Sequence, residues 1–237
     1  MHTKMFQGGL DMAELFPILF FIGFFAIIII VSIYQNKKNK ERQESIRRYA
    51  SMNGLSYKQE VAGFPVEYKF KMNDSGHAHL YEALLLGERN GISFVTFDFA
   101  YTTGSGKNSQ RHIHTVCLLS SADKEFPDFF IREENAFFDY LGKLFGGQDI
   151  NFTEDKTFSK KFVLQGSSEN LIRRFFTSKV RNAFVSGHKK NYVYEAHGDT
   201  FAVQGTGFMK PDERVRFLSD CMRIYKEIMP SENELLG

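Results

Sequence analysis

A run of twenty residues without a charge, Leu15 to Tyr34 (LFPILFFIGFFAIIIIVSIY), constrains this chain more than any other feature. At a rise of about 1.5 Å per residue, a helix of this length spans about 30 Å, the thickness of the hydrocarbon core of a bilayer. Pro17 falls in the first turn, where its missing N–H costs little. Tyr34 falls at the other end, where an interfacial aromatic residue belongs. The run therefore predicts a transmembrane helix.

The alternative interpretation of this run is a cleaved signal peptide. The segment before it, MHTKMFQGGLDMAE, is long and contains Asp11 and Glu14. The apolar run also exceeds the roughly 7–15 residues that are usual for such peptides, and no A-x-A cleavage pattern follows it. We therefore expect an anchor that stays on the protein.

Basic residues gather at one end of the run. The segment from Gln35 to Arg48 contains only two acidic residues, Glu41 and Glu44, and six basic ones, which we name the basic collar: Lys37, Lys38, Lys40, Arg42, Arg47 and Arg48. Only Lys4 lies on the other side, so the positive-inside rule places the collar and everything after it in the cytoplasm. The collar is either a plain stop-transfer flank or a surface that faces anionic lipid headgroups.

Beyond the collar the chain is close to neutral, with 23 Lys and Arg against 24 Asp and Glu from Tyr49 onward. This balance argues against a nucleic-acid-binding protein. The two cysteines, Cys117 and Cys221, are too few for a disulfide framework and fit a reducing compartment, although a single bridge between them stays open.

Side-chain periodicity predicts an α+β domain after the anchor. Alternating apolar and polar residues indicate antiparallel strands at Leu80–Leu86, Ile92–Tyr101 and Arg111–Leu119, with an earlier strand at Val66–Met72. Two short strands are expected later in the chain, at Phe129–Arg132 and Phe162–Gln165, and helices are expected at Asn135–Phe145 and Lys179–Val185. A further helix is expected to be capped by Ser167 or Ser168 and to carry Leu171, Ile172 and Phe175 on its apolar face. A hairpin of Tyr192–His197 with Thr200–Gln204 and a last helix at Pro211–Met229 are expected to complete the domain. Because strands and helices do not alternate as βαβ units, the expected class is an antiparallel-sheet domain with packed helices behind an N-terminal transmembrane helix.

The expected organisation is therefore linear. It consists of an extracytoplasmic N-terminus at 1–14, a transmembrane helix at 15–34, a basic juxtamembrane helix at 35–53, a cytoplasmic α+β domain at 54–229 and a tail at 230–237.

The segment Gly104-Ser105-Gly106-Lys107 has some features of a phosphate-binding loop. The P-loop pattern needs a glycine where Tyr101 stands and a serine or threonine where Asn108 stands, and it must be followed by a helix rather than a strand. We interpret this segment as a hairpin tip, and we expect no nucleotide at this site.

Two His-x-His pairs, His77 with His79 and His112 with His114, are the clustered histidines of the chain. Residues i and i+2 of a strand point to the same face, so each pair can present two imidazoles together, and two neighbouring pairs could bind zinc. No matched cysteine or carboxylate spacing accompanies them, which favours structural or exposed histidines.

Other reactive residues have ordinary interpretations. Cys117 lacks a Cys–His signature and is expected in the core. Asp98 alternates within FVTFDFAY and is expected on a polar outer face. The phenylalanines around Phe126, Phe129, Phe130, Phe137 and Phe138 are expected mainly to fill the core, with a partner surface as the alternative.

The stretch from Tyr81 to Cys117, especially FDFAYTTGSGKNSQRHIHTV, resembles uncharacterised bacterial single-pass membrane-anchored proteins that carry a domain of unknown function. The later run GGQDINFTEDKTFSKKFVLQGSSENLIRRFFTSKVRNAF is similar to the matching part of those domains, so the resemblance covers most of Leu80 to Gln204. It implies a bacterial origin and an inner-membrane address, and it carries over no catalytic residue.

These observations favour a membrane-tethered cytoplasmic interaction or scaffold module with a protein partner, without enzymatic activity, cofactor or nucleic acid. The alternative is a metal-binding enzyme or sensor that uses His77, His79, His112 and His114.

Overall fold

The computed structural model describes residues 12–67, 70–122, 124–134 and 149–229. The chain divides into two units, Met1–Glu44 and Ser45–Gly237.

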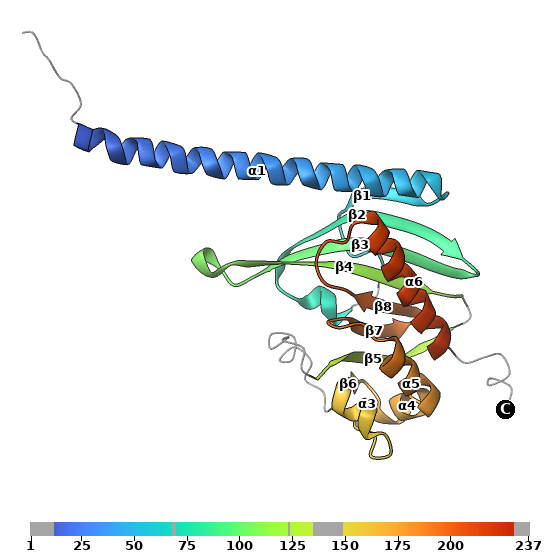
Figure 1. Cartoon of the computed structure of the whole chain (residues 1–237). Coiled ribbons are helices and arrows are strands. Elements are labelled where there is room, and N and C mark those ends of the chain that lie inside the picture. The colour runs from blue at the N-terminus through green and yellow to red at the C-terminus, as the bar shows by residue number, and fades with distance from the viewer. Residues whose placement is uncertain (1–11, 68–69, 123, 135–148, 230–237) are drawn as a thin grey trace, which may run out of the picture. The chain divides into compact units, whose positions relative to one another are not determined.

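The first unit is built on α1 (Met12–Met52), which is one uninterrupted helix (Figure 1). Among the described helices, α1 alone is long and apolar enough to cross a membrane, and its apolar window is 0% buried. An apolar helix of a soluble core would be covered by other elements, so the exposure of Phe16 through Tyr34 identifies an anchor-like helix. The helix continues through the collar and ends before Asn53 and Gly54, as expected, with Gly54 at φ +65°.

The second unit is built on one eight-stranded sheet with the order β1-β2-β3-β4-β8-β7-β5-β6 (Figure 1). All the described strand pairs are antiparallel. The strands are β1 (Ser56–Val61), β2 (His77–Arg89), β3 (Ile92–Thr103), β4 (Gln110–Ser120), β5 (Phe126–Glu133), β6 (Phe162–Gly166), β7 (Val193–Gly198) and β8 (Thr200–Gln204). The predicted α+β class is confirmed.

Tight turns set the register of the hairpins. Asn90 and Gly91 both have positive φ, at 55° and 73°, which matches the right-handed twist of the strands that they join. The turn between β7 and β8 is the predicted Gly198-Asp199, with Gly198 at φ +56°. The polar tip between β3 and β4 contains the short helix η2 (Gly106–Asn108).

One face of the sheet is covered by four helices: α3 (Lys156–Lys161), α4 (Glu169–Phe175), α5 (Ser178–Gly187) and α6 (Pro211–Ile228). In Figure 1, α6 (red) crosses the sheet, and α3, α4 and α5 gather near β5 and β6. The core between them is rich in buried phenylalanine, including the predicted Phe126 and Phe129. Phe137 and Phe138 lie outside the described residues, as does the helix predicted at Asn135–Phe145.

The second face of the sheet is covered by the connection between β1 and β2, which contains the short helix η1 (Lys71–Asp74). The strand predicted at Val66–Met72 was wrong, and the edge strand is instead β1, which pairs with β2. This segment is not a strand because its backbone is bound by Glu195, which is distant in sequence. The Glu195 carboxylate accepts hydrogen bonds from the backbone N–H of Lys71 (2.6 Å) and Met72 (3.2 Å), so these amides are not available to a sheet ladder.

Candidate functional site

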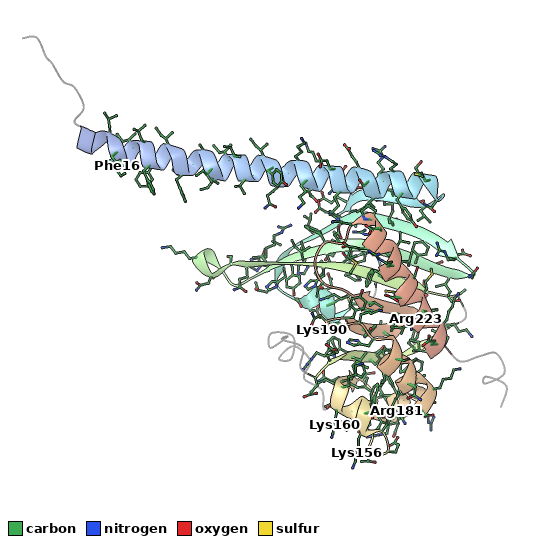
Figure 2. The ribbon with its side chains drawn as sticks, viewed as in Figure 1. Phe16, Lys156, Lys160, Arg181, Lys190 and Arg223 are labelled. Atoms are coloured by element: carbon green, nitrogen blue, oxygen red, sulfur yellow. The ribbon has the colours of Figure 1, made fainter. Side chains whose placement is uncertain are left out.

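The basic collar lies on the second half of α1 and extends over both units. Lys37, Lys38 and Lys40 are exposed, and Arg42 donates a hydrogen bond to Asn39 Oδ1 at 3.2 Å. Arg47 and Arg48 belong to the second unit and are also exposed. There, Ile46 and Ala50 on the opposite face of the helix pack against Ala83 and Leu85 of β2. Figure 2 shows the side chains projecting outward along α1, with Phe16 labelled in the apolar part.

The two His-x-His pairs lie on β2 and β4, and β3 runs between these strands. Tyr101 of β3 fills the space between them: its ring stacks on His112 and His114, with centroids 5.0 and 5.7 Å apart, and lies edge-on to His79 at 6.4 Å. The imidazoles of His79, His112 and His114 therefore surround an aromatic ring instead of a common centre, and His77 is exposed.

Ring nitrogens of these histidines also have protein partners. His79 Nε2 donates to Ser75 O at 2.8 Å, His112 Nε2 hydrogen-bonds with Thr103 Oγ1 at 2.7 Å, and His114 Nδ1 donates to Gly205 O at 3.2 Å. Within the described ranges, no group of three or more His, Cys, Asp or Glu side chains is placed to hold a metal ion. The geometry does not favour the metal-site alternative, which stays an untested prediction.

The two cysteines are both buried, as expected for core thiols, and both are free. Cys117 of β4 and Cys221 of α6 lie within hydrogen-bonding reach of each other between sheet and helix, and burial raises the pKa of the Cys221 thiol well above its ordinary value. The Gly104–Lys107 segment leads into β4, as the hairpin interpretation requires.

Asp98 and Arg214 form a buried ion pair that the sequence patterns did not predict. Asp98 was expected on a polar outer face, but its side chain is 1% exposed and lies 2.5 Å from Nη2 of Arg214, which is equally buried on α6. Thr115 Oγ1 donates to the same Asp98 oxygen at 3.1 Å. The prediction for Asp98 was wrong because alternation along β3 does not reveal that both faces of a central strand are covered.

Two buried groups, Glu195, which the sequence patterns did not single out, and His114, have strongly shifted pKa values. Burial raises the pKa of Glu195 to about 7, although the bonds from Lys71 and Met72 favour its ionised form. Burial lowers the pKa of His114 to about 4, against the hydrogen bond to Gly205. The hydrogen bonds of both side chains hold distant segments of the fold together, and neither residue lines the open cleft of the second unit.

The described surface of the second unit has an open cleft of about 630 Å³, which we name the α4–α6 cleft. This volume lies within the ordinary range of binding sites, about 300–1,000 Å³. The cleft lies where α4, the start of α5 and the end of α6 meet the start of β5, and its apolar lining includes Phe126, Leu171, Phe175, Val180 and Ile228.

Leu171 distinguishes the α4–α6 cleft from ordinary surface. It was predicted to pack with Ile172 and Phe175, but only Ile172 is fully buried, and Leu171 is 51% exposed at the cleft. Arg174 and Lys179 also line the cleft, together with Glu125. The half-exposed Leu171 thus lies in one open cleft with an aromatic floor and charged residues of both signs.

Comparison with known proteins adds one structural relationship. No family model matches the chain, and no curated protein matches it. The resemblance to bacterial domains of unknown function therefore stays a prediction. The crystal structure of the mycobacterial trehalose monomycolate transport factor A, TtfA, is similar with a TM-score of 0.54 and 11% sequence identity, and the match covers 80% of this chain and 97% of that one. At this identity the likeness shows the fold, so the chain shares its α+β architecture with a transport-associated bacterial protein.

Proposed function

We propose that this protein is a single-pass, membrane-tethered interaction module of a bacterial inner membrane, without enzymatic activity of its own. In this proposal residues 1–14 lie outside, 15–34 cross the bilayer, and the domain at 54–229 faces the cytoplasm. The observation that carries the proposal is the apolar half of α1, whose side chains are exposed from Phe16 to Tyr34. Such a surface is stable in hydrocarbon and unfavourable in water.

The charge distribution supports the orientation. The basic collar begins three residues after Tyr34, whereas Lys4 is the single basic residue before the apolar run. Lys and Arg in short flanking segments bias the side that stays in the cytoplasm. A reducing cytoplasm also suits Cys117 and Cys221, which are free although they lie close together.

The domain itself supports a role in binding. Glu195 and His114, whose pKa values are shifted by burial, make hydrogen bonds within the fold, whereas the α4–α6 cleft is open, apolar and rimmed by charge. The similar fold of TtfA, a mycobacterial transport factor, is compatible with a role beside membrane transport machinery. We therefore propose a protein partner in or at the same membrane.

The anchor and its orientation are tested by extraction and by reporter fusions. The full chain is expected to stay in the membrane fraction after washing at alkaline pH. A green fluorescent protein fused after Gly237 is expected to fluoresce, whereas alkaline phosphatase at the same site stays inactive, because that enzyme folds only outside the cytoplasm. Release of the chain by the wash, or an active phosphatase fusion, would contradict the proposal.

The interaction role needs a separate experiment. A biotin ligase fused after Gly237 labels the neighbours of the full chain, and the same ligase fused after Asn53 labels the neighbours of the anchor and collar alone. We expect a reproducible set of proteins that is labelled only by the full chain. Identical sets from the two fusions would show that the domain recruits nothing.

A further inference from the structure

The β3–β4 hairpin extends beyond the strands on both sides of it. On one side, β2 begins at His77, which lies opposite Thr102 of β3. On the other side, the chain that follows β8 reaches β4 at Ile113, whose carbonyl accepts a hydrogen bond from the N–H of Gly207 at 3.0 Å. The segment Gly104–Arg111, which we name the hairpin tip, therefore projects past both neighbours (Figure 1), and all its residues are exposed.

The hairpin tip has a defined shape. The N–H of Asn108 donates to Ser105 O at 3.1 Å, which closes the turn of η2. Gly104 has φ +73°, and a Cβ at this position would clash with the carbonyl oxygen of Asn108. Only glycine fits such a place without strain. The side chain of Lys107 is therefore presented to solvent from a closed turn.

The hairpin tip carries positive charge and no carboxylate. Lys107 and Arg111 belong to it, and no Asp or Glu occurs from Phe99 to Ala122. Neither cationic side chain has an ion pair or hydrogen bond with any residue that the structure describes. The exposed carboxylate of Asp74 belongs to η1, which precedes β2, and not to the tip. The tip is therefore complementary to a negatively charged surface.

The tether keeps the second unit close to a bilayer. In the proposed function Tyr34 lies at the membrane surface, and Ser45, the first residue of the second unit, follows it by eleven residues. Even a fully extended chain of this length spans at most about 40 Å. The phospholipids of the same membrane are therefore present at a high effective concentration, so that a weak contact suffices.

The chain also enters the second unit on the side where the hairpin tip lies. The last turn of α1 reverses directly into β1, and the N–H of Leu55 donates to Ala50 O at 2.9 Å. β1 then runs along β2 from Leu86 towards Tyr81, which is the direction of the tip. This reversal sets the end of α1 antiparallel to β1, and Ile46 and Ala50 pack on β2. The end of α1 therefore arrives from the tip side of the sheet.

We propose that the hairpin tip is a lipid contact, which binds the phosphate groups of anionic phospholipids in the membrane that holds α1. Lys107 and Arg111 pair with the phosphates, and the exposed hydroxyls of Ser105 and Ser109 donate hydrogen bonds to them. Each cation near an anionic surface is expected to strengthen the contact about fivefold. This inference rests on the proposed function, to which it adds a second place where the protein meets the bilayer.

The test uses the full chain in lipid nanodiscs and measures contact with headgroups by fluorescence quenching. A fluorophore is attached at Ser105→Cys, and a small share of the lipid carries a nitroxide quencher on its headgroup. Cys117 and Cys221 are buried, so the wild type is expected to take up no label. Quenching is expected to be at least about threefold stronger with anionic phospholipid than with neutral lipid alone, and high salt is expected to remove this difference.

A second label position separates the hairpin tip from the rest of the sheet. Ser93→Cys places the same fluorophore at the other end of β3, near the turn where Glu88 and Arg89 balance each other. Its quenching is expected to be weak and equal in both kinds of nanodisc. Both serines are exposed, and unchanged circular dichroism confirms that the labelled variants are folded.

A matched pair of charge variants assigns the effect to the two cations. In the Ser105→Cys background, Lys107→Gln/Arg111→Gln is expected to reduce quenching in anionic nanodiscs to the level in neutral ones. Lys156→Gln/Lys160→Gln (both labelled in Figure 2) removes the same charge from exposed positions of α3 and is expected to leave the quenching unchanged.

Three outcomes would overturn the inference. These are equal quenching of the Ser105→Cys label in anionic and neutral nanodiscs, quenching that survives Lys107→Gln/Arg111→Gln, and quenching as strong at Ser93→Cys as at Ser105→Cys. None of these outcomes affects the extraction, reporter or labelling results for the full chain. Failure of the lipid contact and failure of the membrane-tethered module are therefore distinguishable.

Discussion

Arg214 of α6 and Asp98 of β3 form a buried ion pair, with Nη2 2.5 Å from Oδ1 and both side chains 1% exposed. The other terminal nitrogen of Arg214 donates to Ala83 O at 2.6 Å. Ala83 has φ +53° and lies in an irregular part of the register between β2 and β3. A residue other than glycine is strained in this conformation, so the arginine stabilises an unusual backbone as well as joining α6 to the sheet.

Removal of one partner of this pair is expected to be strongly destabilising. Arg214→Met leaves Asp98 as a buried charge, and Asp98→Leu leaves the guanidinium, so each is expected to lower the free energy of unfolding by about 3–5 kcal/mol. The double variant is expected to lose less than the sum, because neither charge is left behind. Denaturant unfolding is followed by far-ultraviolet circular dichroism, since the chain has no tryptophan. Strictly additive losses would contradict this account.

The control is Arg216→Met on the same helix. Arg216 pairs with Asp212 at 3.0 Å, but its side chain is 72% exposed and the pair is solvated. Its loss is expected to change the free energy of unfolding by less than about 1 kcal/mol. A loss similar to that of Arg214→Met would show that burial is not the decisive difference.

Glu195 and His114 are expected to have opposite effects on stability over the same pH range. The folded pKa of Glu195 is about 7, above its ordinary 4.5, so the folded state binds more protons and stability falls as pH rises through this window. The folded pKa of His114 is about 4, below its ordinary 6.5, so the unfolded state binds more protons and stability rises as pH rises from about 4 to 6.5. The two effects largely cancel in the wild type.

Single variants therefore separate these effects. Glu195→Gln is expected to leave a free energy of unfolding that rises with pH between about 4.5 and 6.5, and His114→Gln one that falls, each by an amount on the order of 3 kcal/mol at most. Lys71 and Asp74 also influence the pKa of Glu195, and His112 influences that of His114. Denaturant midpoints over this pH range provide the measurement. Slopes of the same sign for both variants would contradict the assignment.

Many of the strands, turns and helices could be predicted from local sequence patterns. The meander of β2, β3 and β4, the Gly198-Asp199 hairpin and the last helix follow from alternation, turn residues and helical spacing. These features depend on residues that are close in sequence. The order of the sheet, in which β4 lies beside β8, depends on pairing between distant segments and could not be derived in the same way.

Contacts between side chains and segments that are far apart in sequence could not be predicted, because local patterns do not reveal which distant segments meet. The Glu195 carboxylate accepts hydrogen bonds from the backbone N–H groups of Lys71 and Met72, which are more than a hundred residues away in sequence. This segment therefore does not form the strand that alternation indicated there. Arg214 occupies a position on the buried face of α6 that an apolar residue would normally take. Its spacing with Phe217, Leu218 and Cys221 was the one available sign of burial.

The His-x-His pairs are expected to bind no stoichiometric transition metal. Tyr101 lies between the strands that carry them, and hydrogen bonds already engage His79, His112 and His114. The full chain, purified without chelators, is expected to contain well below one zinc, iron or nickel per molecule by mass spectrometry. About one metal ion per chain in the wild type, lost in the variant His112→Gln/His114→Gln, would establish the metal-binding alternative.

The basic collar is expected to retain anionic phospholipid. Each Lys or Arg near an anionic surface contributes about 1 kcal/mol, and Lys37, Lys38 and Lys40 are exposed immediately beyond the apolar run. Replacement of these three lysines by glutamine is expected to reduce the anionic lipid that copurifies with the full chain by at least about threefold. Arg42, Arg47 and Arg48 are kept so that the orientation bias is preserved. The measurement is lipid mass spectrometry after purification at low salt.

A matched control distinguishes lipid binding from net charge. Lys156, Lys160 and Lys190 are also exposed, but they belong to the second unit (Figure 2), and their replacement by glutamine removes the same charge. If the collar binds headgroups, this second triple variant keeps the wild-type lipid content, and high salt removes the difference between the two variants because exposed charges are screened. If both triple variants lose the same amount of lipid, the collar acts only as a stop-transfer flank that fixes the orientation of α1.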